Sequence, residues 1–151
     1  MKNEQFPLYH KNYQLLKFLY KTVKNFPKEH KYSLGKEMTD LAWQCLDLTI
    51  EANGLPNNQK APKISELSAV FDRLKMRVRL AQEIDLLSIG QFVHLQENFL
   101  LAIGQEIGGW LKWAGKVGGG GAKRAIDFFR GNSMMGNIYY KIKLDFAFIL
   151  V

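Results

Sequence analysis

The stretch LSAVFDRLKMRVRLA, residues 67–81, decides the fold. Its apolar residues recur at intervals of four, three, four and three, as on one face of an α-helix: Leu67, Phe71, Leu74, Val78 and Ala81. Basic residues border this face, with Arg73 and Arg77 on one flank and Lys75 and Arg79 on the other. The pattern predicts an amphipathic helix over residues 62–87 that packs its apolar face against other helices.

Two helices are predicted before this stretch. The first covers residues 8–25 and is followed by Pro27. One stripe of helical spacing holds Tyr9, Tyr13, Leu16, Tyr20 and Val23, and it is widened by Leu15, Leu19 and Phe26. The second begins near Ser33 and ends at Asn53-Gly54, and its stripe holds Leu34, Met38, Leu41, Cys45, Leu48 and Ala52. Both stripes are expected to face a common core.

A fourth helix is predicted from Ser88 to about Trp113. Ser88 and Gln91 have the spacing of a capping box, in which each side chain bonds the backbone N–H of the other residue. The apolar side is expected to hold Phe92, Phe99, Ile103, Ile107 and Trp110.

Short connections between the predicted helices favour antiparallel neighbours. We therefore expect an all-α protein, an antiparallel up-down-up-down four-helix bundle over residues 1–116. In this topology the first and third helices lie on one diagonal. Residues 117–151 are expected to form a glycine-rich linker and a poorly ordered or loosely packed tail, in which residues 141–151 alternate like a strand.

Charge alternates from segment to segment along the chain, whose formal net charge is +7. Residues 2–31 carry +5 and residues 60–79 carry +4, whereas residues 33–53 and 80–113 each carry −3. This balance is consistent with a polyanionic partner. Because the basic helices lie on opposite corners, one subunit would not gather its positive charge on one side, but a ring of subunits could. The candidate nucleic-acid-binding residues are Lys11, Lys17, Lys21, Lys24, Arg73, Lys75, Arg77 and Arg79.

No set of residues points to catalysis or to a cofactor. Histidines His10, His30 and His94 lack the spacing of metal ligands, and Cys45 lies on an apolar stripe. The glycine run lacks the Gly-Lys-Ser/Thr ending of a phosphate-binding loop. We expect no enzyme activity, no metal and no cofactor. The N-terminal residues lack a signal-peptide pattern and no segment is apolar enough to span a bilayer, so we expect a cytoplasmic protein.

Glycines inside the fourth helix are unusual, because each costs about 1 kcal/mol relative to alanine. Gly104 and Gly108 fall on one face and could admit the backbone of another helix. The alternative is that Gly108-Gly109 begins the end of the helix. Candidates for an oligomer interface or for close packing are Gly104, Gly108, Gly109 and Trp110.

Several motifs, read in order, resemble one family. They are Pro7-Leu8-Tyr9, Asn25-Phe26-Pro27-Lys28, Tyr32-Ser33-Leu34-Gly35, Ile50-Glu51-Ala52-Asn53, Arg77-Val78-Arg79-Leu80-Ala81 and Ile107-Gly108-Gly109-Trp110-Leu111-Lys112. Over residues 6–114 the chain resembles the accessory variability determinant (Avd) proteins of diversity-generating retroelements. It is similar, more distantly, to the four-helix-bundle proteins encoded in ribosomal-RNA intervening sequences.

The resemblance implies a homopentamer that binds a reverse transcriptase and its template-repeat RNA, with DNA as a further candidate ligand. With them it would support mutagenic retrohoming, without being the polymerase. Two alternatives stay open. One is a stand-alone bundle of the intervening-sequence type, and the other is a bundle that reaches anionic membrane through its basic, hydrophobic tail.

Overall fold

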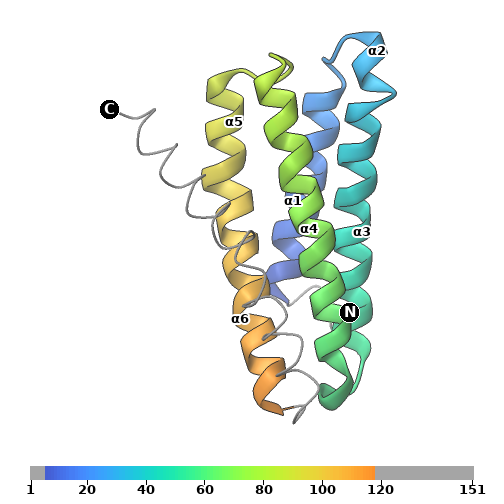
Figure 1. Ribbon diagram of the computed structural model, residues 1–151, viewed down its shortest axis with the longest axis vertical. Helices are drawn as coiled ribbons and strands as arrows, with labels where there is room; N and C mark the ends of the chain where they lie inside the picture. The colour runs from blue at the N-terminus through green and yellow to red at the C-terminus, as the bar shows by residue number, and fades with distance from the viewer. Residues whose placement is uncertain (1–5, 118–151) are drawn as a thin grey trace.

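The computed structural model describes residues 6–117, and all its regular structure in that range is helical (Figure 1). Three long helices and a fourth, composite rod form a bundle, and short helical turns lie in two of the connections. The elements are α1 (Pro7–Val23), α2 (Lys28–Lys31), α3 (Leu34–Gly54), η2 (Asn57–Gln59), α4 (Lys60–Glu83), α5 (Ile89–Leu95), η3 (Gln96–Leu100) and α6 (Leu101–Val117). The all-α, four-helix-bundle prediction is confirmed. The predicted tail beyond Val117 lies outside the described residues, so the domain boundary stays a prediction.

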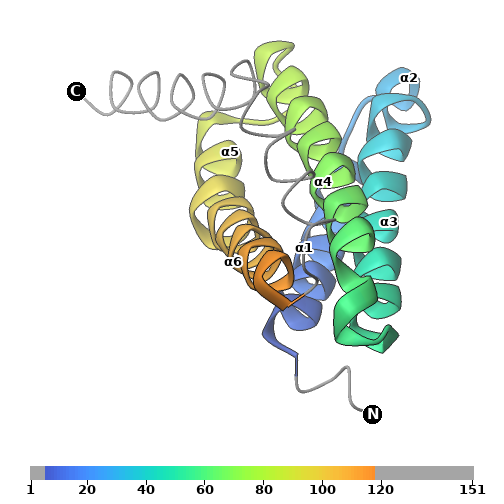
Figure 2. The same ribbon diagram turned by 60° about the horizontal axis from the view of Figure 1, so that its bottom comes forward.

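The four rods run alternately up and down, with α4 in front of α1 and with α3 and the α5–η3–α6 rod on the two sides (Figures 1 and 2). The helix α3 packs against both α1 and α4, and α6 also packs against both. The two helices that carry most of the basic residues, α1 and α4, therefore occupy one diagonal, as the sequence predicted.

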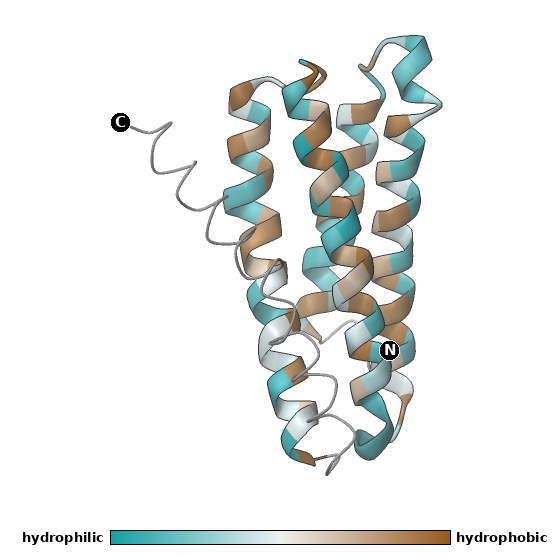
Figure 3. Ribbon diagram, in the orientation of Figure 1, coloured by the Kyte–Doolittle hydropathy of each residue, from teal (hydrophilic) through white to brown (hydrophobic). Residues whose placement is uncertain are grey.

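Hydrophobic and hydrophilic residues alternate along each rod, as amphipathic helices require (Figure 3). Every member of the stripes predicted for α3 and α4 is buried, Leu67, Leu74, Val78 and Ala81 completely. Two helix ends differ from the prediction, since α4 begins at Lys60 and ends at Glu83.

The stripe predicted for the first helix is confirmed at Leu15, Leu16, Leu19 and Val23 but is wrong at the tyrosines. Tyr13 and Tyr20 are 41% and 51% exposed, and the buried face of α1 holds Leu8, Asn12, Leu15, Leu16, Leu19, Thr22 and Val23. Asn12 is buried in this face because its Nδ2 donates to Thr49 Oγ1 of α3 at 3.1 Å. A polar residue thus completes an apolar stripe, and the tyrosines are left on the surface.

The fourth rod begins with the predicted capping box. The backbone N–H of Gln91 donates to Ser88 Oγ at 3.1 Å, and that of Ser88 donates to Gln91 Oε1 at 3.0 Å. The rod then contains a π-helical turn at Gln96–Leu100, which the sequence did not predict. The wider turn lets Leu95 and Leu100, five residues apart, both reach the core. As a result Phe92, Phe99 and Trp110 are only partly buried. The rod also continues to Val117, so the expectation that Gly108-Gly109 ends the helix is wrong.

The connections are closed by specific contacts. Gly35 lies so close to the end of α1 that a Cβ there would be 2.6 Å from Val23 Cγ1. Lys60 is buried, and its Nζ donates to the carbonyl oxygens of Ala52 and Asn53, each at 2.8 Å. It thereby supplies hydrogen-bond donors to carbonyls at the C-terminal end of α3, where the helix itself provides none. Burial lowers the pKa of Lys60.

The C-terminal end of α4 is capped by backbone hydrogen bonds. The N–H groups of Leu86 and Asp85 donate to the carbonyls of Ala81 and Gln82, with Asp85 in the left-handed conformation at a φ of 63°.

Candidate nucleic-acid interface

Three of the predicted residues, Lys17, Lys21 and Lys24, lie together on the outer side of α1. We call them the lysine face. Their spacings of four and three place them on neighbouring turns, and all three are exposed. Among residues 6–117 no carboxylate forms an ion pair with any of them. Their charge is therefore available to an outside anion.

Lys11 lies away from the lysine face, because six residues of helix separate it from Lys17 by about a third of a turn. Its Nζ forms an ion pair with Glu106 Oε1 at 2.9 Å, across the boundary between α1 and α6. This pairing reduces the charge that Lys11 offers to a phosphate.

The basic residues of α4 are mostly paired as well. Lys75 lies 2.7 Å from Asp72, and Arg79 lies 2.8 Å from Glu83 on the same helix. Arg77 reaches across to Glu37 of α3 at 3.4 Å. Only Arg73, of the four predicted residues on α4, has no ion-pair partner within the described part of the chain.

These partly exposed pairs contribute little to stability, about 0–1 kcal/mol each, so an arginine could exchange its carboxylate for a phosphate at small cost. Even so, of the four predicted basic residues on α4 only one lacks an ion-pair partner in the described residues, whereas all three residues of the lysine face lack one. The two sets lie on opposite corners of the bundle, and one subunit does not bring them together.

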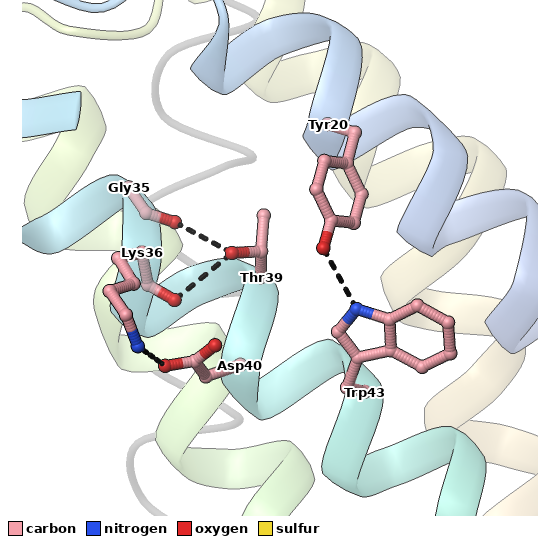
Figure 4. A network of polar contacts seen from close by, with 6 residues as sticks. All are labelled: Tyr20, Gly35, Lys36, Thr39, Asp40 and Trp43. Carbon is pink, nitrogen blue, oxygen red and sulfur yellow. Dashed lines mark hydrogen bonds and ion pairs between the residues drawn. The ribbon is translucent and has the colours of Figure 1, made fainter. Parts of the chain in front are cut away.

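Aromatic side chains border the lysine face. Lys17 Nζ lies 5.1 Å from the centre of the Tyr13 ring, a cation–π contact. Between α1 and α3, Trp43 Nε1 donates to Tyr20 Oη at 2.9 Å, so the two side chains point toward one another (Figure 4). This feature was not predicted, because both tyrosines were expected in the core and Trp43 was given no role. The alternation Tyr13, Lys17, Tyr20, Lys24 on one helix face was the available signal.

On α3, the positive charge of Lys36 is compensated by a neighbouring carboxylate. Lys36 forms an ion pair with Asp40 (Figure 4), and the hydrogen bond and charge of that carboxylate raise the pKa of Lys36. Thr39 Oγ1 bonds the carbonyls of Gly35 and Lys36 and stays within its own helix. The surface of α3 beside the aromatic residues thus offers no unpaired cation.

Two glycines of α6, Gly108 and Gly109, do not serve close packing inside the described part of the subunit. A Cβ at Gly108 or Gly109 would meet no atom within 4 Å. Trp110, by contrast, packs edge-on against Phe6 with ring centres 5.0 Å apart, and both line a shallow groove with Lys11 and Glu106. The proposed oligomer interface at Gly104, Gly108 and Gly109 stays a prediction.

Three other kinds of functional feature are a metal site, a membrane-spanning helix and a reactive thiol. Between residues 6 and 117, no group of three His, Cys, Asp or Glu side chains could hold a metal ion. None of the helices described is long and apolar enough to cross a membrane. Cys45 is buried, and this burial, together with the charge of Asp72, raises the pKa of its thiol to about 12.

Comparison with known proteins gave one match. A family model described as bAvd-like matches residues 6–114, which is the whole bundle except Gly115–Val117. No curated protein and no solved structure matches the chain.

Proposed function

Because the chain belongs to the bAvd-like family, we propose that this Avd-type accessory protein binds the template-repeat RNA of a diversity-generating retroelement and partners its reverse transcriptase. It would hold and position the RNA for mutagenic retrohoming without carrying out catalysis of its own.

One observation supports RNA binding above the others, namely the lysine face. Lysine side chains that lack a carboxylate partner raise the local potential and displace condensed cations from a nucleic-acid backbone. Binding of this kind follows the phosphates, so it has a steep salt dependence and little base specificity. Lys17, Lys21 and Lys24 lie on successive turns of one rigid helix, which suits a run of phosphates.

Assembly would multiply this surface. We propose the homopentamer that the family resemblance implies, with the glycine face of α6 as a contact between subunits. The open space around Gly108 and Gly109 supports a role outside the subunit. A closed ring would then repeat the lysine face and the α4 arginines around one axis.

A salt series of RNA gel shifts tests RNA binding. The variant Lys17→Gln/Lys24→Gln removes two unpaired charges, and Lys36→Gln/Lys63→Gln removes two charges that are paired with carboxylates. We expect the first variant to weaken binding and to reduce the slope of log K against log salt by about 1.4–1.8. The control should change both quantities much less. Equal effects of the two variants would exclude the lysine face as the site.

The second half of the proposal needs a partner assay. A reverse transcriptase encoded beside this gene should co-purify with the chain and with RNA. A stand-alone bundle of the intervening-sequence type would co-purify with no reverse transcriptase. Arg73→Glu/Arg77→Glu/Arg79→Glu tests the α4 surface in both assays.

A further inference from the structure

We propose that the lysine face binds unpaired nucleotides, whose bases stack on the exposed Tyr20–Trp43 aromatic pair while their phosphates follow Lys17, Lys21 and Lys24. This inference rests on the proposed function, because it names the form of nucleic acid that the same surface recognises. It gives the site a preference for single strands that lysines alone would not supply.

The first support is the order of side chains along α1. Tyr13, Lys17, Tyr20 and Lys24 follow one another at intervals of four, three and four, so rings and cations alternate on one helix face. The row spans about 16 Å along the helix axis, enough for two or three nucleotides. Alternating cations and rings can contact alternating phosphates and bases.

The second support is the state of the aromatic pair. Tyr20 and Trp43 remain 51% and 43% exposed, although they are large apolar side chains. Their polar atoms satisfy each other, because the indole N–H donates to the tyrosine oxygen. The pair is thus held across two helices, and both of its residues stay exposed. Rings of this kind stack on any base, since every base has a π face.

The third support is the charge beside the pair. Asp47 lies one turn after Trp43 on α3 and is exposed, whereas Asp40, one turn before Trp43, is paired with Lys36. Carboxylates repel phosphates, so the backbone of a bound strand is expected to stay over α1 and to turn its bases toward α3. A duplex cannot do this, because its bases are already stacked and paired inside the helix.

Binding of three probes to the full-length protein tests the inference. The probes are a single-stranded RNA, the same sequence as an RNA duplex, and the single-stranded DNA equivalent. In the variant Tyr20→Leu/Trp43→Leu we expect affinity for both single strands to fall about 5- to 100-fold, which is the range for losing one stacked base. Affinity for the duplex should stay within about twofold of the wild type. Stacking needs no 2′-hydroxyl, so RNA and DNA single strands should lose affinity alike.

Two further variants control for folding and for the kind of contact. Tyr20→Phe keeps the ring but removes the oxygen that accepts from Trp43, so it should lose much less single-strand affinity than the leucine variant does. Trp113→Leu removes an equally exposed tryptophan from α6, on the other side of the bundle, and should have no effect on any probe. Irradiation of RNA that contains 5-iodouridine should crosslink the wild type at Tyr20 or Trp43.

The possible outcomes separate this inference from the proposal beneath it. If Lys17→Gln/Lys24→Gln weakens binding but the leucine variant lowers single-strand and duplex affinity equally or not at all, the stacking model is wrong and the RNA-binding proposal stands. If neither variant weakens binding of any probe, both are wrong. If the aromatic pair serves only to recruit the reverse transcriptase, the leucine variant leaves the binding of all three probes unchanged, which is the first of these results.

Discussion

Substitution of Gly35 by alanine should destabilise the bundle where α1 meets α3. The added Cβ would lie 2.6 Å from Val23 Cγ1, 3.2 Å from the carbonyl oxygen of His30 and 3.3 Å from Phe26 Cδ2. Val23 would have to retreat by about 0.8 Å to reach an ordinary contact distance, and a β-branched side chain in a helix has little rotamer freedom with which to do so. The backbone carbonyl of His30 can move even less.

The magnitude follows from two opposing terms. Overpacking of a filled site costs about 1–3 kcal/mol. Replacing glycine by alanine in a helix returns up to about 1 kcal/mol, and less at the second residue of a helix. The net expectation is a loss of about 1–2 kcal/mol, or a fall in Tm of about 3–6 °C for a chain of this size.

Urea unfolding followed by circular dichroism measures this loss. Gly90 provides a matched control, since it is also the second residue of a helix and a Cβ there would meet only Ser88 Oγ, at 3.9 Å. Gly90→Ala should leave stability unchanged or raise it slightly. Equal stability of the Gly35 and Gly90 variants would refute the packing argument.

Three other changes test local features of the fold. Ser88→Ala removes the side-chain acceptor of the capping box and should cost about 1 kcal/mol in urea unfolding, whereas Ser88→Asp should retain most of the stability. Asp85→Gly should stabilise the chain by about 0.5–1 kcal/mol, because a φ of 63° strains a residue with a Cβ. Asp85→Ala should not stabilise it, because alanine also has a Cβ. The thiol of Cys45, with its pKa raised from 9.0 to about 12, should stay unreactive toward iodoacetamide in the folded protein at pH 9. Because the folded state keeps the thiol proton to a higher pH than the unfolded state does, the protonated thiol contributes fully to the free energy of unfolding below pH 9. This contribution is lost as the pH rises toward 12. The free energy of unfolding of Cys45→Ala, measured in urea, should therefore depend less on pH between 9 and 12 than that of the wild type.

The sequence was sufficient for the helices whose apolar stripe is uninterrupted. In α3 and α4 the predicted residues all lie in the core, because no competing stripe exists on either helix. In α1 the tyrosines have the same helical spacing as the buried leucines, so periodicity alone placed them in the core. Asn12, a polar residue, is buried in α1 and donates a hydrogen bond to Thr49, a residue 37 positions away. Periodicity within one segment cannot reveal such a partner.

The candidate site was predictable in its charges but not in their pairing. Basic residues can be counted in a sequence, yet Arg77 meets Glu37 and Lys11 meets Glu106 only after folding. The contrast between the paired residues of α4 and the lysine face therefore comes from the structure. So does the meeting of Tyr20 with Trp43, which depends on how α1 and α3 are rotated against each other.

The π-helical turn at Gln96–Leu100 holds one residue more than a regular helix would need to join the two halves of the fourth rod. Loss of one residue from this turn would leave Leu95 and Leu100 four positions apart in a regular α-helix, so both would still face the interior. The fourth rod can thus lose a single codon at this place while α5 and α6 keep their orientation toward the rest of the bundle.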